Sequence, residues 1–474
     1  MKKSIIYFAV VIICIFNPFS VTAQEKCEKS KFRVEVDSMV DDILNRFDEK
    51  MGTYIFRDET TEIEGTDEFE SSEMDKKSDD RESFKRYRTS TSYAVKPEKS
   101  IVRNTFPTFP WETIDERILF RYNRVEGLFL GLNYPQKYYW NDDKFSLFAS
   151  GGYGFKSHRW RGGIGASQQF GIENRIFEIG TEIHSLTDTK DQWIIDIEEN
   201  NLAAIILRDD YRDYFGREGF SIWSGFYKKW MRTDLQFQIA YLNDQYESLE
   251  RRTNWSIFGG DKIFRENPNI EEGRMKSILT SFKIHSTQSQ RIFTSGWSAS
   301  ISIEAAGRAF GGNYDFNSYT IDLRRYQPIT RYSNLNIRFR TASATNDVPV
   351  QKSFELGGLS TLPAYRFKEF TGNRMLLANA EYLINGKMLD DVEFFPSWLL
   401  RNLNIIIFAD AGYISNVDKD ASVIKGFQDI NSKNLHSDWG IGIGTRDAKL
   451  RLGFAWRTDK SSPPMVFLRL NRPF

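Results

Sequence analysis

The chain holds few residues of the kinds that carry out catalysis or bind metal ions. Its histidines lack the spacing of a metal site and have no cysteine partner; they are His158, His184, His285 and His436. The stretch HSD at 436–438 could suggest a hydrolase. These residues open an alternating segment and point to opposite faces, which favours positions at a polar rim or in a lumen. We therefore expect that the protein is not an enzyme and that it has no catalytic residue, no metal site and no cofactor.

The elements that must position such residues are alternating segments, which recur from about residue 118. In LRLGFAW at 450–456, Leu450, Leu452, Phe454 and Trp456 alternate with small or charged residues. A period of two over about ten residues is typical of a strand with lipid on one side and a polar lumen on the other. A half-buried strand of a soluble sandwich alternates in the same way, so alternation alone leaves both folds open.

Connection lengths favour a membrane barrel. Strands are predicted at about 118–123, 128–134, 144–155, 159–170, 174–185, 219–231, 233–245, 273–288, 292–306, 314–327, 330–343, 373–385, 402–413, 434–446, 448–458 and 464–473. If the first strand runs outward, long connections fall outside and tight turns inside, as in outer-membrane barrels. The long connections are 186–218, 246–272, 344–372 and 414–433; the turns are 171–173, 289–291, 328–329 and 446–447. The predicted fold is all-β, a transmembrane antiparallel β-barrel of about 16 strands.

Two connections depart from this simple pattern. The inner connection 386–401 is longer than the other inner turns, and the pattern offers no reason for it. The outer connection 186–218 has helix-like periodicity, which predicts either a surface lid or a local mini-core.

Composition is consistent with a barrel and argues against a helical membrane protein and a nucleic-acid-binding protein. Aromatic residues make up 15% of the chain, more than a protein with a mean hydropathy of −0.49 needs for a water-soluble core. Beyond residue 23 no apolar stretch approaches the roughly 20 residues of a spanning helix. Without Lys2 and Lys3, 62 basic residues remain against 64 acidic ones, a net charge near −2. This balance argues against nucleic acid as a partner.

The N-terminal region predicts export and a periplasmic segment. Lys2 and Lys3, the apolar run IIYFAVVIICIF and the small residues VTA indicate a signal peptide over 1–23. Cleavage leaves Cys27 alone, so no intrachain disulfide is expected. Residues 24–56 are expected to hold an amphipathic helix, and 57–116 an acidic, largely disordered linker before the barrel at 117–474. The helix has apolar residues that could bind a periplasmic partner: Val36, Val40, Ile43 and Phe47.

The C-terminus has the pattern of an assembly signal. In VFLRLNRPF, Leu468, Leu470 and the terminal Phe474 share one alternating face, and Arg472 breaks the alternation. Barrel-assembly machinery is therefore an expected partner during biogenesis, with outer-membrane lipid as the surrounding medium. A chance C-terminal phenylalanine is the alternative.

Several stretches together resemble the BamA/TamA superfamily of outer-membrane proteins, the bacterial surface antigen domain. They are YNRVEGLFLGL at 122–132, ELGGLSTLPAYRFKEFTGNRMLLANAEY at 355–382, FADAGY at 408–413 and GIGIGTRDAKLRLGFAW at 440–456. The resemblance covers about residues 117–474. It implies that the loop at 355–373 opens with the glycine pair Gly357 and Gly358 and folds back into the lumen.

The tip of this loop departs from the family pattern. The family presents an Arg-Gly-aromatic tip to an acidic residue of the barrel wall, whereas this chain has Pro363 and Ala364 before Tyr365. We expect Arg366 to supply the cation and to reach Asp410 or Glu381, with Tyr365 packed on the wall. The alternative is that Arg366 is a solvated loop charge.

The resemblance implies a Gram-negative outer-membrane protein whose N-terminal segment lies in the periplasm, with a role in assembly or translocation of protein or small substrates. Family members that insert or secrete proteins carry POTRA repeats, and we expect none here. An assembly role would use the short first strand as a weak seam against the last, open to a client strand. A gated channel or surface-binding barrel without lateral opening is the alternative, and an outer-membrane enzyme ranks third.

Overall fold

The chain divides into two compact units, 1–89 and 90–474. The computed structural model describes residues 113–115, 117–137, 142–289, 293–389, 401–431, 434–445 and 450–470, all in the second unit. The predicted signal peptide, the helix with Val36, Val40, Ile43 and Phe47, most of the linker and the terminal Phe474 lie outside the described residues.

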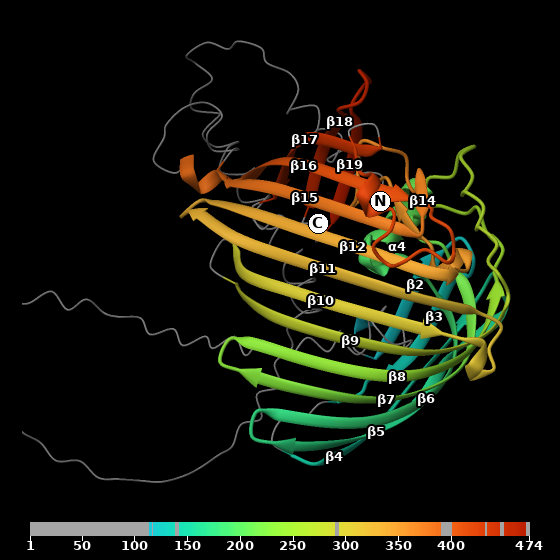
Figure 1. Cartoon of the computed structure of the whole chain (residues 1–474). Coiled ribbons are helices and arrows are strands. Elements are labelled where there is room, and N and C mark those ends of the chain that lie inside the picture. Colours follow the sequence, from blue (N-terminus) through green and yellow to red (C-terminus); the bar gives the residue numbers. More distant parts are fainter. Residues whose placement is uncertain are drawn as a thin grey trace, which may run out of the picture. The chain divides into compact units, whose positions relative to one another are not determined.

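One antiparallel sheet forms the body of the second unit. Its strands are β1 (Thr113–Asp115), β2 (Ile118–Asn123), β3 (Gly127–Tyr134), β4 (Lys144–Gly154), β5 (Arg159–Ile172), β6 (Arg175–Asp188), β7 (Phe215–Trp230), β8 (Thr233–Ser248), β9 (Gly273–Ser289), β10 (Thr294–Ala306), β11 (Asp315–Thr330), β12 (Ser333–Asp347), β15 (Arg374–Asn385), β16 (Leu403–Ser415), β17 (Leu435–Thr445), β18 (Leu450–Arg457) and β19 (Met465–Leu470). Figure 1 shows β4 to β12 lying side by side in chain order. Because β9 pairs with β10, the sheet runs without a break from β2 to β19, and among the described residues no strand ladder joins β19 to β2. All sixteen predicted strands are confirmed, and β1 is a short addition that pairs with β2.

Alternation along each strand divides the sheet into two faces. In β16, Ile405 and Ile407 are exposed, whereas Ile406 and Phe408 are buried. The neighbouring β17 follows the same rule, since exposed Ile441 lies opposite Ile407. The exposed face is apolar and the buried face carries polar and small residues, as a barrel in lipid requires.

The four longest connections all lie at one end of the strands. The long ones are 189–214, 249–272, 348–373 and 416–434. Turns of two residues, at 173–174, 231–232 and 331–332, lie at the other end. We call these the long-loop end and the tight-turn end. The predicted segregation is confirmed, and of the inner connection 386–401 the structure describes a 3-10 turn at Gly386–Leu389 and residue 401.

The long loops have structure of their own. The connection 189–214 contains the helix α4 (Ile197–Leu207). The connection 348–373 contains a small hairpin of β13 (Phe354–Leu356) and β14 (Phe370–Gly372). Over the described part of the chain, no helix has the length and apolar character needed to cross a membrane.

Two adjacent residues of β10 test the assignment of the faces. Ile301 lies on the exposed face, and Ser300 lies opposite Asp322 on the inward face. We expect Ile301→Arg to lower the free energy of unfolding by about 2–4 kcal/mol, the range for arginine at the bilayer midplane. Ser300→Arg should have a smaller effect, because a guanidinium on the inward face is not placed in lipid. Urea-dependent folding into lipid vesicles measures both, and equal losses would contradict the assignment.

Candidate functional site

The loop 348–373 is shaped by its glycine pair. Gly357 and Gly358 follow β13 with φ angles of +117° and +81°, a region that side chains disfavour. A Cβ atom on Gly357 would lie 2.3 Å from the carbonyl oxygen of Arg366, across the loop. The two glycines therefore let the loop fold back on itself.

The folded loop packs against the inward face of the barrel wall. Leu356, Leu362 and Tyr365 are almost fully buried and share one cluster with inward-facing Ile406 and Phe408. Below the loop a cavity of about 50 Å³ remains, lined among others by Ser360, Asn379, Asp410, Arg451 and Arg469. The loop thus fills the space next to strands β15 to β19.

The HSD stretch of β17 holds the tip of this loop. The backbone N–H of Ala364 donates to Asp438 Oδ2 at 2.8 Å, and the Tyr365 hydroxyl donates to the carbonyl of Ser437 at 3.2 Å. His436 stacks on Phe370 with 3.8 Å between ring centroids. Sequence reasoning placed these residues at a rim or in a lumen and missed this contact, which joins two distant segments.

Arg366 does not make the ion pair that the sequence predicted. Its side chain is exposed, and among the described residues no contact joins it to Asp410 or Glu381. Asp410 instead accepts a hydrogen bond from Asn379 at 2.7 Å, and Glu381 pairs with Arg451 at 3.1 Å. Both carboxylates have partners on the wall itself, and the turn after Pro363 directs residue 366 away from them. The alternative of a solvated loop charge agrees with the exposed side chain.

The cation that anchors the loop is Lys368. Its Nζ lies 2.8 Å from Asp191, 2.5 Å from Asp213 and 2.8 Å from Glu355. Burial alone would lower the pKa of Lys368, but the three carboxylates hold its pKa well above the ordinary value. Asp191 and Asp213 belong to the connection 189–214, so Lys368 joins two long loops. The acidic residues of that connection were a visible signal in the sequence, but it did not identify their partner.

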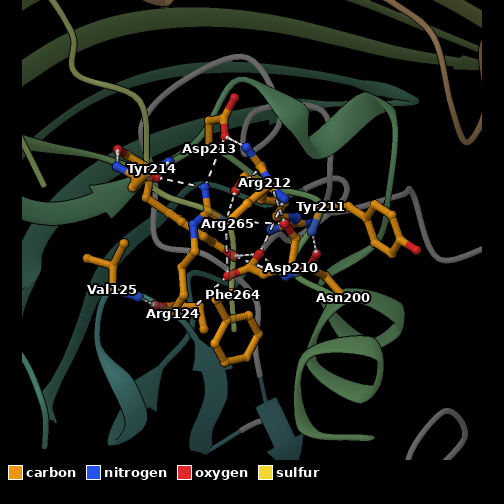
Figure 2. A network of polar contacts seen from close by, with 12 residues as sticks. Arg124, Val125, Asn200, Asp210, Tyr211, Arg212, Asp213, Tyr214, Phe264 and Arg265 are labelled. Atoms are coloured by element: carbon orange, nitrogen blue, oxygen red, sulfur yellow. Dashed lines mark hydrogen bonds and ion pairs between the residues drawn. The ribbon is translucent and has the colours of Figure 1, made fainter. Parts of the chain in front are cut away.

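Arginine side chains from two further segments also form ion pairs with Asp213. Arg124, in the turn between β2 and β3, and Arg265, in the connection 249–272, reach Asp213 Oδ1 at 3.0 and 2.5 Å. Figure 2 shows both arginines directed towards Asp210 and Asp213. Burial would raise the pKa of Asp213, but Lys368, Arg265 and Arg124 together hold that pKa below its ordinary value. One carboxylate therefore ties together the first hairpin and three long loops.

Helix α4 lies at the seam, by which we mean the junction between the first barrel strand β2 and the last strand β19. The backbone N–H of Tyr122 in β2 donates to Asn201 Oδ1 at 3.1 Å. The backbone N–H of Leu470 in β19 donates to Glu199 Oε1 at 2.8 Å, and Arg469 pairs with the same carboxylate at 2.9 Å. Two side chains of one helix turn thus contact both strands of the seam.

The predicted assembly-signal residues lie partly within the described chain. Leu468 and Leu470 alternate with inward-facing Arg469 on β19 and so belong to its outward face. Phe474 lies outside the described residues. Within the described residues, no group of histidine, cysteine or acidic side chains has the arrangement to hold a metal ion.

We expect Lys368→Met to release the loop 348–373. Removal of the cation leaves three carboxylates close together, and breaking a buried ion pair in this way costs about 3–5 kcal/mol. Trypsin should then cleave after Arg366 several times faster in protein folded in vesicles, as measured by mass spectrometry. Lys419→Met is the control, because its pair with Asp347 is exposed at both ends and contributes about 0–1 kcal/mol. Equal cleavage rates in the two variants would contradict an anchoring role.

Acid should release the same loop. Because the pKa of Asp213 is lowered, its stabilising effect is complete above its ordinary value of about 3.9 and is lost below it. The raised pKa of Lys368 keeps its effect intact up to about pH 10. A spin label at position 366 should therefore have constant mobility from about pH 5 to 9 and become more mobile below about pH 4. The acid step should be absent in the Lys368→Met variant.

Comparisons with known proteins place this architecture in a family. The model of the Omp85 superfamily domain matches residues 164–463. Curated proteins give no match to the chain. BamA from Haemophilus ducreyi lacking POTRA domains 1–3 is a similar solved structure, with a TM-score of 0.44 and 13% identity over 73% of this chain and 67% of that chain. CdiB from Acinetobacter baumannii has a TM-score of 0.37 and 10% identity over 72% of this chain and 55% of that chain. Because the family model matches more than half of its length, the chain belongs to the Omp85 superfamily of outer-membrane β-barrels.

Proposed function

We propose that this barrel assembles or translocates protein or small substrates at the outer membrane by opening its seam. The observation that carries this proposal is how two backbone N–H groups of the seam strands β2 and β19 are hydrogen-bonded. The backbone N–H groups of Tyr122 and Leu470 are bonded to side chains of α4 and not to the opposite strand. The edge of β2 pairs with the short strand β1 at Ile118 and Leu119, and beyond it Tyr122 is held by a side chain. An edge held in this way can be offered to a client strand by β-augmentation.

The alternative is a gated channel or surface-binding barrel without lateral opening. The packing of the loop 348–373 favours it, because a cavity lined by both the loop and the wall has a volume of about 50 Å³. A solute could cross at this side of the lumen only after the loop had moved. In that function Gly357, Gly358, Tyr365 and Lys368 would form the gate.

The N-terminal region completes the proposal. We assign 1–23 to a signal peptide, 24–56 to a periplasmic helix and 57–116 to a linker, as the sequence pattern indicates. Apolar residues of the helix, such as Val36 and Phe47, would bind a periplasmic partner. Leu468, Leu470 and Phe474 would be read by the barrel-assembly machinery during biogenesis.

A disulfide across the seam tests the proposed function. Cysteine pairs are scanned along β2 and β19 in a chain that lacks Cys14 and Cys27, and the pair that oxidises most completely is used. We expect the locked barrel to lose activity in the native host, measured as growth and as assembly of surface proteins. Reductant should restore both.

The matched control is a disulfide between Phe120→Cys and Leu130→Cys. These residues lie directly opposite in β2 and β3, a pair that does not need to separate. The control should remain active when oxidised. If the locked seam is also fully active, lateral opening is not required, and the gated channel or surface-binding barrel replaces the proposed function.

A further inference from the structure

The sequence of α4, IEENNLAAIIL, is divided along its length. Residues 198–201 are polar, whereas 202–207 are all apolar. A helix on the surface of a soluble core is instead divided around its circumference. A division along the axis suits a helix that begins in an aqueous space and ends in hydrocarbon.

The polar half of α4 begins inside the barrel. Just before it, Trp193 lies over the guanidinium of inward-facing Arg340, with 4.2 Å to the ring centroid. The carbonyl of Ile194 accepts a hydrogen bond from Ser360 of the loop 348–373 at 2.7 Å. Glu199 then pairs with inward-facing Arg469. These contacts fix the start of the helix to the luminal wall.

The apolar half of α4 lies on the outward face of the barrel. Tyr122 lies opposite Leu128 and shares its face with exposed Leu130, yet it is only 5% exposed. Ala204 of the helix and Phe264 of the connection 249–272 cover its ring. A residue of the lipid-facing surface is therefore covered by a helix that starts in the lumen.

The end of the helix continues the apolar outer surface. Leu202 and Leu207 are 42% and 49% exposed. The N–H of Ile257 donates to the carbonyl of Ile205 at 2.9 Å, which attaches the connection 249–272 to the helix. That connection adds Phe258, which is 65% exposed. This end of the helix therefore carries an apolar outer surface, bounded by the ion pair of Lys262 with Asp209.

We propose that α4 is a displaceable wedge, which passes through the seam from lumen to lipid and holds β2 and β19 apart at Tyr122 and Leu470. The inference rests on the proposed function, because the wedge controls activity only if the seam moves. When the wedge leaves, these two N–H groups become available to an extended client segment. A helix of this length is marginal by itself in water, so its position depends on the contacts described above.

Pulsed EPR distances test the wedge directly. Spin labels are placed on the outward face through Phe120→Cys in β2 and Leu468→Cys in β19, in a chain without other cysteines. The double variant Glu199→Ala with Asn201→Ala removes both seam contacts of α4. We expect the mean distance to shorten by up to about 10 Å, because a helix is about 10 Å wide and paired strands are about 4.8 Å apart.

The matched control is Glu198→Ala with Leu202→Ala. These residues are in the same helix turn, but their side chains are exposed, so the distance should stay that of the parent chain. An unchanged distance in the first variant, or an equal change in the control, would overturn the proposal.

A second measurement places spin labels on α4 in a chain that keeps Glu199 and Asn201. A spin label at Leu207 should collide mainly with oxygen, which dissolves in lipid. A label at Glu198 should collide mainly with a water-soluble nickel complex. Collision with the nickel complex at both positions would overturn the passage from lumen to lipid, even if the alanine variants failed to fold.

A tether separates the failure of the wedge from the failure of the proposed function. A disulfide between Tyr122→Cys and Asn201→Cys keeps α4 in place, and we expect it to abolish activity until reduced. If the seam lock abolishes activity but the tether does not, the wedge is wrong and the proposed function stands. If the seam lock leaves activity intact while the EPR distances shorten as expected, the wedge stands and the proposed function fails.

Discussion

The backbone N–H groups on the open edges of β2 and β19 must find hydrogen-bond acceptors, because the hydrocarbon of a membrane offers none. In most β-barrels the neighbouring strand supplies them. Here two side chains of α4 take that role for Tyr122 and Leu470. The path of the connection 189–214 follows from this requirement, since a helix that serves both edges must lie between them.

The long loops behave as a connected set around this helix. Asp213 joins the first hairpin to the connections 189–214, 249–272 and 348–373 through Arg124, Arg265 and Lys368. Arg469 joins β19 to two of the same segments, through Glu199 and Ser360. The loop 348–373 is therefore connected to the seam by a continuous set of ion pairs and hydrogen bonds.

The strands could be predicted because alternation and turn spacing are local properties of the chain. Predicted and observed ends differ by four residues at the start of β7 and at the end of β12. β7 begins at Phe215 and not at 219, since its first residues pack under the long loops. The luminal cation could not be predicted in this way. Lys368 has a left-handed backbone with a φ of +54°, and this turn decides that Lys368 and not Arg366 meets the carboxylates. The periodicity of 186–218 indicated a helix, but no local pattern states which distant strands a helix touches.

The division of α4 along its axis has a consequence for the order in which the chain is built. Glu199 precedes Leu470 by 271 positions, yet the last strand is bonded to it. Until the last strand has been made, the buried carboxylate of Glu199 therefore lacks both the cation of Arg469 and the N–H group of Leu470. This junction is complete only when both halves of the chain are present.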